Sequence, residues 1–242
     1  MNALSRFIAR IHASIRGVDM APHGVPLREK EVPRGLHKEY PRMPRIELPA
    51  PETLTLPLSE ALHNRASFSV CEDSRQFSSG ELGSLLGNAL GMRTAMRRQY
   101  PSGGGLFPIE TYLIGTVLER YPSGVFHYHP KAHALEFLWE TSPSFTMAEI
   151  IRAGDTPFAP ILVIFTSVWS RSSVKYAELA YAHGLIEAGH MAENILLAAT
   201  ALGIHARPLA GFYDEAVSTL LDLPKDIEQP VYGVLLCPSA MP

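Results

Sequence analysis

Residues 100–110 read Tyr-Pro-Ser-Gly-Gly-Gly-Leu-Phe-Pro-Ile-Glu and lie between a predicted helix and a predicted strand. Three consecutive glycines permit positive φ angles and let a ligand approach the backbone amides closely. No Lys-Ser or Lys-Thr pair follows the glycines, so this stretch is not a P-loop. Taken alone, a glycine-rich turn is more often only a turn, and its surroundings decide whether it binds anything.

Short elements precede and follow this turn. Ser78 or Ser79 is the expected cap of a helix, and alternation of apolar residues after the turn indicates a strand that leads into a hairpin around Pro130 and Lys131. The expected helices are 58–64 and 79–91, and the expected strands are 110–118, 125–129 and 134–139.

The second half of the chain predicts a buried strand and a long helix. Residues 161–165 form an apolar strand, residues 177–202 a helix that Gly203 ends, residues 211–221 a further helix and residues 230–237 a closing strand. Helices and strands are mixed without regular βαβ alternation or an internal repeat. The fold class that this pattern favours is α+β.

The long helix is small or apolar on most of its surface, with Ala180, Gly184, Ala188, Gly189 and Ala192 along it. Such a helix must be buried on several sides. We expect a homodimer, in which the second subunit buries the part of this helix that its own chain leaves exposed.

Composition places the chain among globular proteins. It has 242 residues, 46% of them hydrophobic, and a formal net charge of −3, so nothing demands nucleic acid as a partner. Cys71 and Cys237 have no metal or redox spacing and are interpreted as free thiols of a reducing compartment. Arginines interrupt the apolar stretches near the N-terminus, so we expect neither a signal peptide nor a membrane span, and a cytoplasmic location.

The N-terminal region differs from the rest. Residues 1–50 hold nine Lys/Arg against five Asp/Glu, and apolar residues at helical spacing predict a short amphipathic helix near Ile11. Residues 21–57 are rich in proline and predict an extended arm on the surface. We therefore divide the chain into an arm, residues 1–57, and a body, residues 58–242.

Arg65, Ser67 and Ser69 form the first candidate site. An arginine with two hydroxyls at alternating positions can hold a phosphate through a charged fork and hydrogen bonds. The alternative is an exposed helix end with Arg65 in solvent.

Lys175 and Tyr176 form the second candidate site, just before the long helix. A helix N-terminus disfavours an ammonium and favours a phenolate, which would move both groups toward an acid/base role at neutral pH. The alternative is a surface lysine beside a half-buried tyrosine.

Histidines offer a weaker metal hypothesis. His183, Glu187 and His190 share a helical face as an E-x-x-H pattern, but di-iron sites need a second such motif and further carboxylates. His127 and His129 alternate onto one strand face, which a hairpin surface explains equally well. We expect no metal.

Five stretches, taken in order, resemble the SagB-type dehydrogenases, the thiazole/oxazole oxidase branch of the nitroreductase family. The resemblance covers essentially the whole chain, and it rests on the order of the stretches because none is specific alone. The stretches are residues 65–67, 100–110, 124–130, 175–181 and 187–199, and the lead that ends at residues 46–49 is also similar.

This resemblance implies a nitroreductase-like fold with an antiparallel-rich central sheet flanked by helices, and FMN bound between two subunits. Arg65, Ser67 and Ser69 match the phosphate and ribityl end. Pro101, Ser102 and Gly103 match the loop under the isoalloxazine, and Ala210 and Gly211 begin the segment whose amides face N5 and O4. Lys175 and Tyr176 match the proton-removing pair of azoline oxidases.

One departure concerns the phosphate motif, which in the family reads Arg-Arg-Ser-x-Arg and here reads Arg-Ala-Ser-Phe-Ser over residues 65–69. Two positive charges are missing, and we expect either weaker FMN binding or compensation by Arg207 or an arginine of the arm. A second change, Glu193 where the family often has glutamine, has no interpretation.

The resemblance implies an FMN-dependent oxidoreductase that dehydrogenates a thiazoline or oxazoline in peptide natural-product biosynthesis. Its expected partners are a second copy of the chain, a peptide or small-molecule heterocyclic substrate and other biosynthetic enzymes. One alternative is an NAD(P)H-dependent reductase of nitro or quinone compounds. Another is a non-catalytic subunit of a biosynthetic complex.

Overall fold

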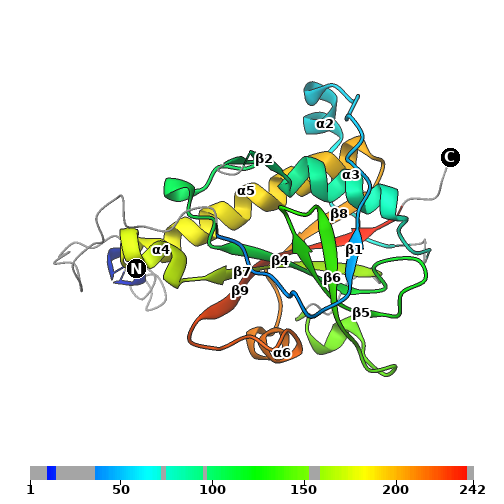
Figure 1. Ribbon diagram of the computed structural model, residues 1–242. Helices are drawn as coiled ribbons and strands as arrows, with labels where there is room; N and C mark the ends of the chain where they lie inside the picture. Colours follow the sequence, from blue (N-terminus) through cyan, green and yellow to red (C-terminus); the bar gives the residue numbers. More distant parts are fainter. Residues whose placement is uncertain (1–9, 15–35, 72–74, 95–96, 153–158, 239–242) are drawn as a thin grey trace.

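The computed structural model describes residues 10–14, 36–71, 75–94, 97–152 and 159–238 (Figure 1). Their centre is a seven-stranded sheet in the order β1-β6-β5-β4-β7-β9-β8, and all its neighbouring strands pair antiparallel. The predicted α+β class is confirmed. The strands are β1 (Arg45–Glu47), β2 (Met92–Thr94), β3 (Arg97–Arg98), β4 (Ile109–Gly115), β5 (Gly124–His129), β6 (Ala134–Glu140), β7 (Ile161–Val168), β8 (His205–Leu209) and β9 (Glu228–Cys237). The helices are α2 (Leu58–Asn64), α3 (Ser79–Leu90), α4 (Ser170–Tyr176), α5 (Leu179–Ala201) and α6 (Asp214–Leu220), with short 3₁₀ turns at Gly103–Gly105 and Met147–Glu149.

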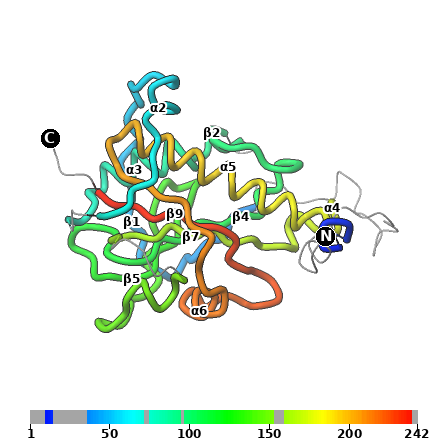
Figure 2. The backbone as a smooth tube through the Cα atoms, turned by 180° about the vertical axis from the view of Figure 1, so that it is seen from behind, coloured from blue at the N-terminus to red at the C-terminus, as the bar shows by residue number. Residues whose placement is uncertain are grey.

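Helices α3 and α5 cover one face of the sheet, and α6 lies on the other (Figure 1, Figure 2). Alternate side chains of a strand point to opposite faces, so β4 contributes to both cores. Ile109 and Leu113 join the core under α5, whereas Tyr112 and Ile114 join the core on the α6 side. Burial on both faces explains why β4 and β7 are nearly continuous apolar runs.

Local sequence signals fix helix α3 at both ends. The Ser78 hydroxyl accepts the Glu81 N–H at 3.2 Å, and the Glu81 carboxylate accepts the Ser78 N–H at 2.9 Å, which together make a capping box. The helix ends at Gly91, whose N–H donates to the Gly87 carbonyl. The predicted helix and its serine cap are confirmed.

The long helix is α5, which begins two residues later than predicted because Ala177 interrupts the helical conformation. Ala177 has a φ of +46°, a left-handed conformation that separates α4 from α5. Alanine rarely adopts a positive φ, so its presence at position 177 does not predict that the helix is interrupted there. At the other end Gly203, with a φ of +70°, stops the helix as predicted.

Part of the predicted N-terminal arm lies against the sheet. Residues 10–14 are helical, in line with the predicted amphipathic helix, whereas residues 15–35 lie outside the described residues. Residues 36–47, which we call the strap, cross the α6-side face and supply the edge strand β1. Within the strap, the Lys38 ammonium donates to Glu228 at 2.7 Å and to the Tyr112 hydroxyl at 2.8 Å. The division of the chain at residue 57 stays a prediction.

A buried imidazolium sits beneath the strap. His127 places Nε2 2.9 Å from Glu110 and Nδ1 2.9 Å from Glu136, and carboxylates only accept hydrogen bonds, so both ring nitrogens carry protons. Burial opposes the charge on His127, but these two hydrogen bonds outweigh it and raise its pKa. Burial likewise opposes ionisation of the glutamates, yet bonding to His127 lowers the pKa of each to about 2. The prediction that a hairpin surface explains His127 is wrong, since the residue is fully buried.

Cys71 and Cys237 form a disulfide, with their Cα atoms 5.8 Å apart. The prediction of two free thiols is therefore wrong, because folding brings together residues that are 166 positions apart in sequence. This pairing also removes the argument from free thiols for a reducing compartment. Within the described residues, no helix combines the length and apolar character needed to span a bilayer.

Candidate functional site

The Gly loop, residues 101–105, turns sharply between β3 and β4. Gly104 and Gly105 have φ angles of +65° and +66°, which suit glycine, and Ser102 braces the turn by accepting the Phe107 N–H at 2.9 Å. Among the described residues, a Cβ atom on Gly105 would meet nothing within 4 Å, which leaves one side of the loop open to a ligand within that part of the chain.

Lys175 and Tyr176 converge on this loop. A Cβ atom on Gly104 would lie 2.8 Å from the Tyr176 hydroxyl and 3.2 Å from the Lys175 ammonium nitrogen. Both residues lie just before α5, as predicted, but they belong to the last turn of α4, and Ala177 separates them from α5. This separate short helix was not predicted from the sequence, so the argument from the N-terminus of the long helix does not apply directly to the pair. The new finding is that Lys175 and Tyr176 lie close to the Gly loop, which the sequence did not predict.

A group of buried polar atoms lies behind the loop. The ring of His183 packs edge-on against Tyr176, with centroids 4.5 Å apart. Glu187, one turn further along α5, is 3% exposed, and burial raises its pKa to about 7 against the opposing effect of a hydrogen bond from Ser102. His190 is exposed, so it does not join these two residues in the E-x-x-H ligand set considered above.

The predicted phosphate residues lie beside β8. Ser67 forms a parallel bridge with Ala206, and the Arg207 guanidinium donates to the Phe68 carbonyl at 3.4 Å. Arg207 is therefore adjacent to the 65–69 segment, as the expected replacement for a missing arginine would be. Ser67 and Ser69 are exposed and Arg65 is half-buried, so this group is accessible to an anion.

The phosphate residues and the Gly loop lie at opposite ends of α5. Gly103 lies near His183 in the first turns of α5, whereas Ser67 pairs with β8 just beyond the helix C-terminus. Figure 1 shows α4 and α2 at the two ends of this helix, and a helix of 23 residues spans about 34 Å. A single chain does not bring these two groups of predicted residues together.

Of the third predicted group, Ala210 and Gly211, the first lines a groove on the far side of α5. This groove has a volume of about 470 Å³ and includes Ala210, Phe212, Tyr181 and Leu185. Successive helical residues are about 100° apart, so Tyr181 and Leu185 face away from His183 and Glu187. The predicted isoalloxazine loop and the predicted amide segment therefore flank α5 on opposite sides.

The sequence analysis missed the aromatic wall of this groove. Trp169 and Tyr181 stack with ring centroids 5.3 Å apart, and Tyr181 is 46% exposed. The available signal was the Tyr181–Leu185 pair, two large side chains at a spacing of four on a helix that otherwise carries many small residues. The Gly211 carbonyl accepts the Arg152 N–H at 2.7 Å, which fixes the segment beside the groove.

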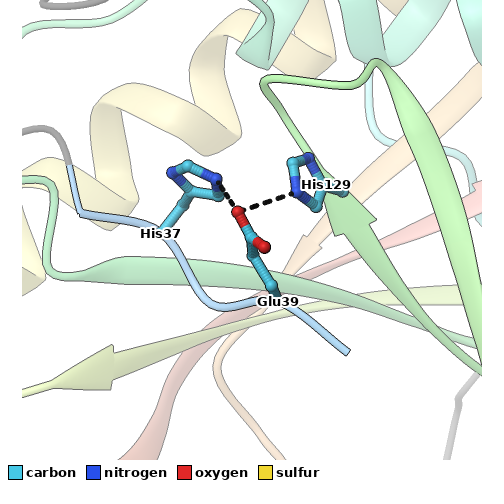
Figure 3. Close-up of side chains that lie close together, drawn as sticks. All are labelled: His37, Glu39 and His129. Carbon is cyan, nitrogen blue, oxygen red and sulfur yellow. Dashed lines mark hydrogen bonds and ion pairs between the residues drawn. The ribbon is translucent and has the colours of Figure 1, made fainter. Parts of the chain in front are cut away.

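Figure 3 shows another cluster, His37, Glu39 and His129, whose ligand atoms lie within 4.8 Å of one another. The Ala132 N–H donates to His129 Nδ1 at 3.0 Å, which places the ring proton on Nε2. Burial lowers the pKa of His129, consistent with a neutral ring. Nε2 then points its proton at Glu39 and offers no lone pair to a metal. The cluster joins the strap to the β5–β6 hairpin.

Comparisons with known proteins find relatives of the chain. It is 31% identical over 138 residues to the microcin B17-processing protein McbC of Escherichia coli, covering 53% of this chain and 50% of that protein. It is 27% identical over 222 residues to the trifolitoxin-processing protein TfxB of Rhizobium leguminosarum bv. trifolii, covering 84% of this chain and 58% of that protein. The chain thus spans only 50–58% of the length of these curated relatives.

A solved structure shows the same fold. A chain of the E. coli microcin synthetase McbBCD complex with truncated pro-MccB17 bound matches with a TM-score of 0.62 and 21% identity, covering 98% of this chain and 93% of that one. The family resemblance and the fold that the sequence predicted are confirmed. Because the nitroreductase family model matches residues 72–236, more than half of its length, the chain belongs to the nitroreductase family.

Proposed function

We propose that the chain is an FMN-dependent oxidase that dehydrogenates a thiazoline- or oxazoline-type heterocycle in a peptide natural product. The observation that carries the proposal is the convergence of the Lys175 and Tyr176 polar ends on the open Gly loop. Two relatives named for processing microcin B17 and trifolitoxin support the substrate class. Family membership supports oxidoreductase chemistry.

The residues present fit FMN. Arg65, Arg207, Ser67 and Ser69 offer two guanidinium groups and two hydroxyls to a phosphate. The open side of Gly105 lets a flat ring approach the backbone. When bound, FMN supplies the two-electron acceptor that side chains lack.

In the proposed reaction the protein removes a proton while the substrate loses a hydride. Lys175 and Tyr176 reach the same point beside Gly104, so either polar end can take the substrate proton and the other can hold the ring. Other biosynthetic enzymes are proposed partners, because a solved chain with the same fold is part of the McbBCD synthetase complex.

Arg65→Ala is expected to weaken FMN binding by about 10- to 150-fold, since a hydrogen bond to a charged group contributes about 1.5–3 kcal/mol. Equilibrium titration of apoprotein with FMN, followed by flavin fluorescence, measures the effect. Arg120→Ala, which changes an exposed arginine between β4 and β5, is the matched control and should bind FMN as the wild type does. Equal affinities for the two variants would remove Arg65 from the cradle.

We further propose that two chains share each flavin, because the predicted contacts lie at both ends and on both sides of α5. Co-expression of an Arg65→Ala chain with a Lys175→Ala chain is then expected to restore about a quarter of wild-type activity. Half of the randomly paired dimers contain one chain of each variant. In each such dimer, one of the two sites takes wild-type Arg65 from one chain and wild-type Lys175 from the other, so a quarter of all sites are intact. Each variant expressed alone supplies the baseline. No gain on co-expression would show that one chain provides both halves.

The reductase alternative has its own test. Steady oxidation of NADPH with a nitroaromatic compound, and none of an azoline peptide with oxygen, would replace the oxidase proposal with a nitro or quinone reductase. Purified protein without stoichiometric flavin would favour the non-catalytic subunit.

A further inference from the structure

Glu187 is a buried carboxyl group directly behind the Gly loop. Its side chain is 3% exposed, and Oε1 has no hydrogen-bond partner among the described residues. An unpaired oxygen of a buried carboxyl group costs stability, so such groups occur in proteins where they serve another purpose. The proposed reaction leaves this group without a role.

Glu187 lies close to the loop and to the Lys-Tyr pair. The Ser102 hydroxyl accepts the Phe107 N–H, and its proximity favours the ionised form of Glu187. His183 lies one turn before Glu187 on the same helical face, and its Nδ1 is likewise buried without a hydrogen-bond partner among the described residues. The His183 ring in turn packs edge-on against Tyr176. Tyr176, His183 and Glu187 thus follow one another from the loop into the interior.

Two arginines from two elements act on the Glu187 carboxyl group. Arg98 of β3 and Arg171 of α4 both favour the ionised form of Glu187, while burial opposes it more strongly. The Tyr100 hydroxyl also faces the carboxyl group and stays protonated, because burial raises its pKa well above the ordinary value. Near neutral pH the Glu187 carboxyl can therefore both accept and release a proton.

We propose that Glu187, acting through His183, holds the proton that Lys175 and Tyr176 remove from the substrate. Glu187 is then a positioning residue for the proton, not a group that touches the substrate. This inference rests on the proposed azoline oxidation and assigns the route of its proton.

The proposed step balances. Bound FMN would accept one substrate hydrogen with its electron pair, and dioxygen would later take up those two electrons, that hydrogen and one proton as hydrogen peroxide. A second substrate C–H bond gives its proton to the Lys-Tyr pair, while its electrons form the new ring double bond. His183 takes this proton from Tyr176 and passes another to the Glu187 carboxylate. The stored proton is the one that hydrogen peroxide takes up, which returns Glu187 to its ionised form.

Glu187→Gln is the test variant, because the amide resembles the neutral acid in shape and cannot titrate. In the wild type, the rate of anaerobic flavin bleaching by an azoline peptide is expected to rise with pH through an inflection near 7. In Glu187→Gln the rate should fall about 10²-fold and lose that inflection. Glu187→Asp should regain the inflection with part of the rate. Glu193→Gln, at an exposed position of the same helix, should match the wild type. An unchanged inflection in Glu187→Gln would overturn the proposal.

A second readout does not depend on turnover. An acid whose folded pKa is raised stabilises the fold only while it stays protonated, so the wild type loses stability relative to Glu187→Gln as pH rises from about 4.5 to 7. Thermal unfolding of both purified proteins across this range should show the difference widen and then level off. A constant difference would overturn the inference even in an active enzyme. A widening difference in a wild type that never bleaches with azolines would refute the oxidase proposal instead, and leave Glu187 as a titrating group behind the loop.

Discussion

Lys175→Ala is expected to keep its FMN and to lose azoline turnover by about 10²–10⁴-fold, the range in which general-base catalysis contributes. Tyr176→Phe should behave in the same way, since both polar ends meet beside Gly104. Neither side chain is among the predicted phosphate-binding residues at the other end of α5, so flavin content should not change. Anaerobic bleaching of the flavin by substrate, compared between wild type and variant, measures the loss.

Two comparisons make this prediction specific. Reduction of the bound flavin by dithionite should proceed equally in wild type and variants, because it needs no protein base. Lys131→Ala, in the exposed β5–β6 turn, changes a lysine far from the Gly loop and should turn over at the wild-type rate. If Lys175→Ala bleaches as fast as the wild type, the pair is structural and the reductase alternative gains support.

His127→Gln is expected to destabilise the fold by about 3–5 kcal/mol, the effect of breaking a buried ion pair on one side. A neutral amide would leave Glu110 and Glu136 as buried carboxylates without a cation between them. Chemical denaturation at pH 7 measures the change. His63→Gln, at an exposed position of α2, is the matched control and should stay within about 0.5 kcal/mol of the wild type.

The same cluster predicts the pH dependence of stability. The glutamates have folded pKa values lowered to about 2, so their contribution is complete above about 4.5 and is lost as pH falls toward 2. The His127 pKa is raised, so its contribution is complete below about 6.5 and is lost as pH rises through the folded value. Wild-type stability should fall in both directions, and His127→Gln should lack the alkaline fall. A wild-type profile that is flat on the alkaline side would argue against the buried imidazolium.

Local patterns predicted the elements whose signals lie within a few residues. Ser78 and Glu81 mark the start of α3 within four positions, and Gly203 marks the end of α5. The break at Ala177 was missed because alanine does not signal a left-handed conformation. The disulfide and the strap contacts were missed because they join residues 166 and 190 positions apart, which no local period encodes.

The site was predictable in composition but not in arrangement. Family resemblance identified Arg65, Ser102, Lys175 and Ala210 from short motifs, since these residues keep a fixed order along the chain. Their distribution around α5 depends on how that helix packs, which the motifs do not contain. Glu187 was considered only as a metal ligand, because its burial behind the Gly loop follows from the contact between α5 and the loop.

The Cys71–Cys237 bond turns most of this chain into a covalent ring. The ring encloses residues 72–236, the same span that matches the nitroreductase family, while Arg65, Ser67 and Ser69 lie on the open tail outside it. Under denaturing conditions, a single backbone cut within the ring leaves both pieces covalently joined, whereas a cut in the tail yields a separate fragment. The redox state of one sulfur pair thus decides whether a molecule nicked within the ring separates into two fragments once it is denatured.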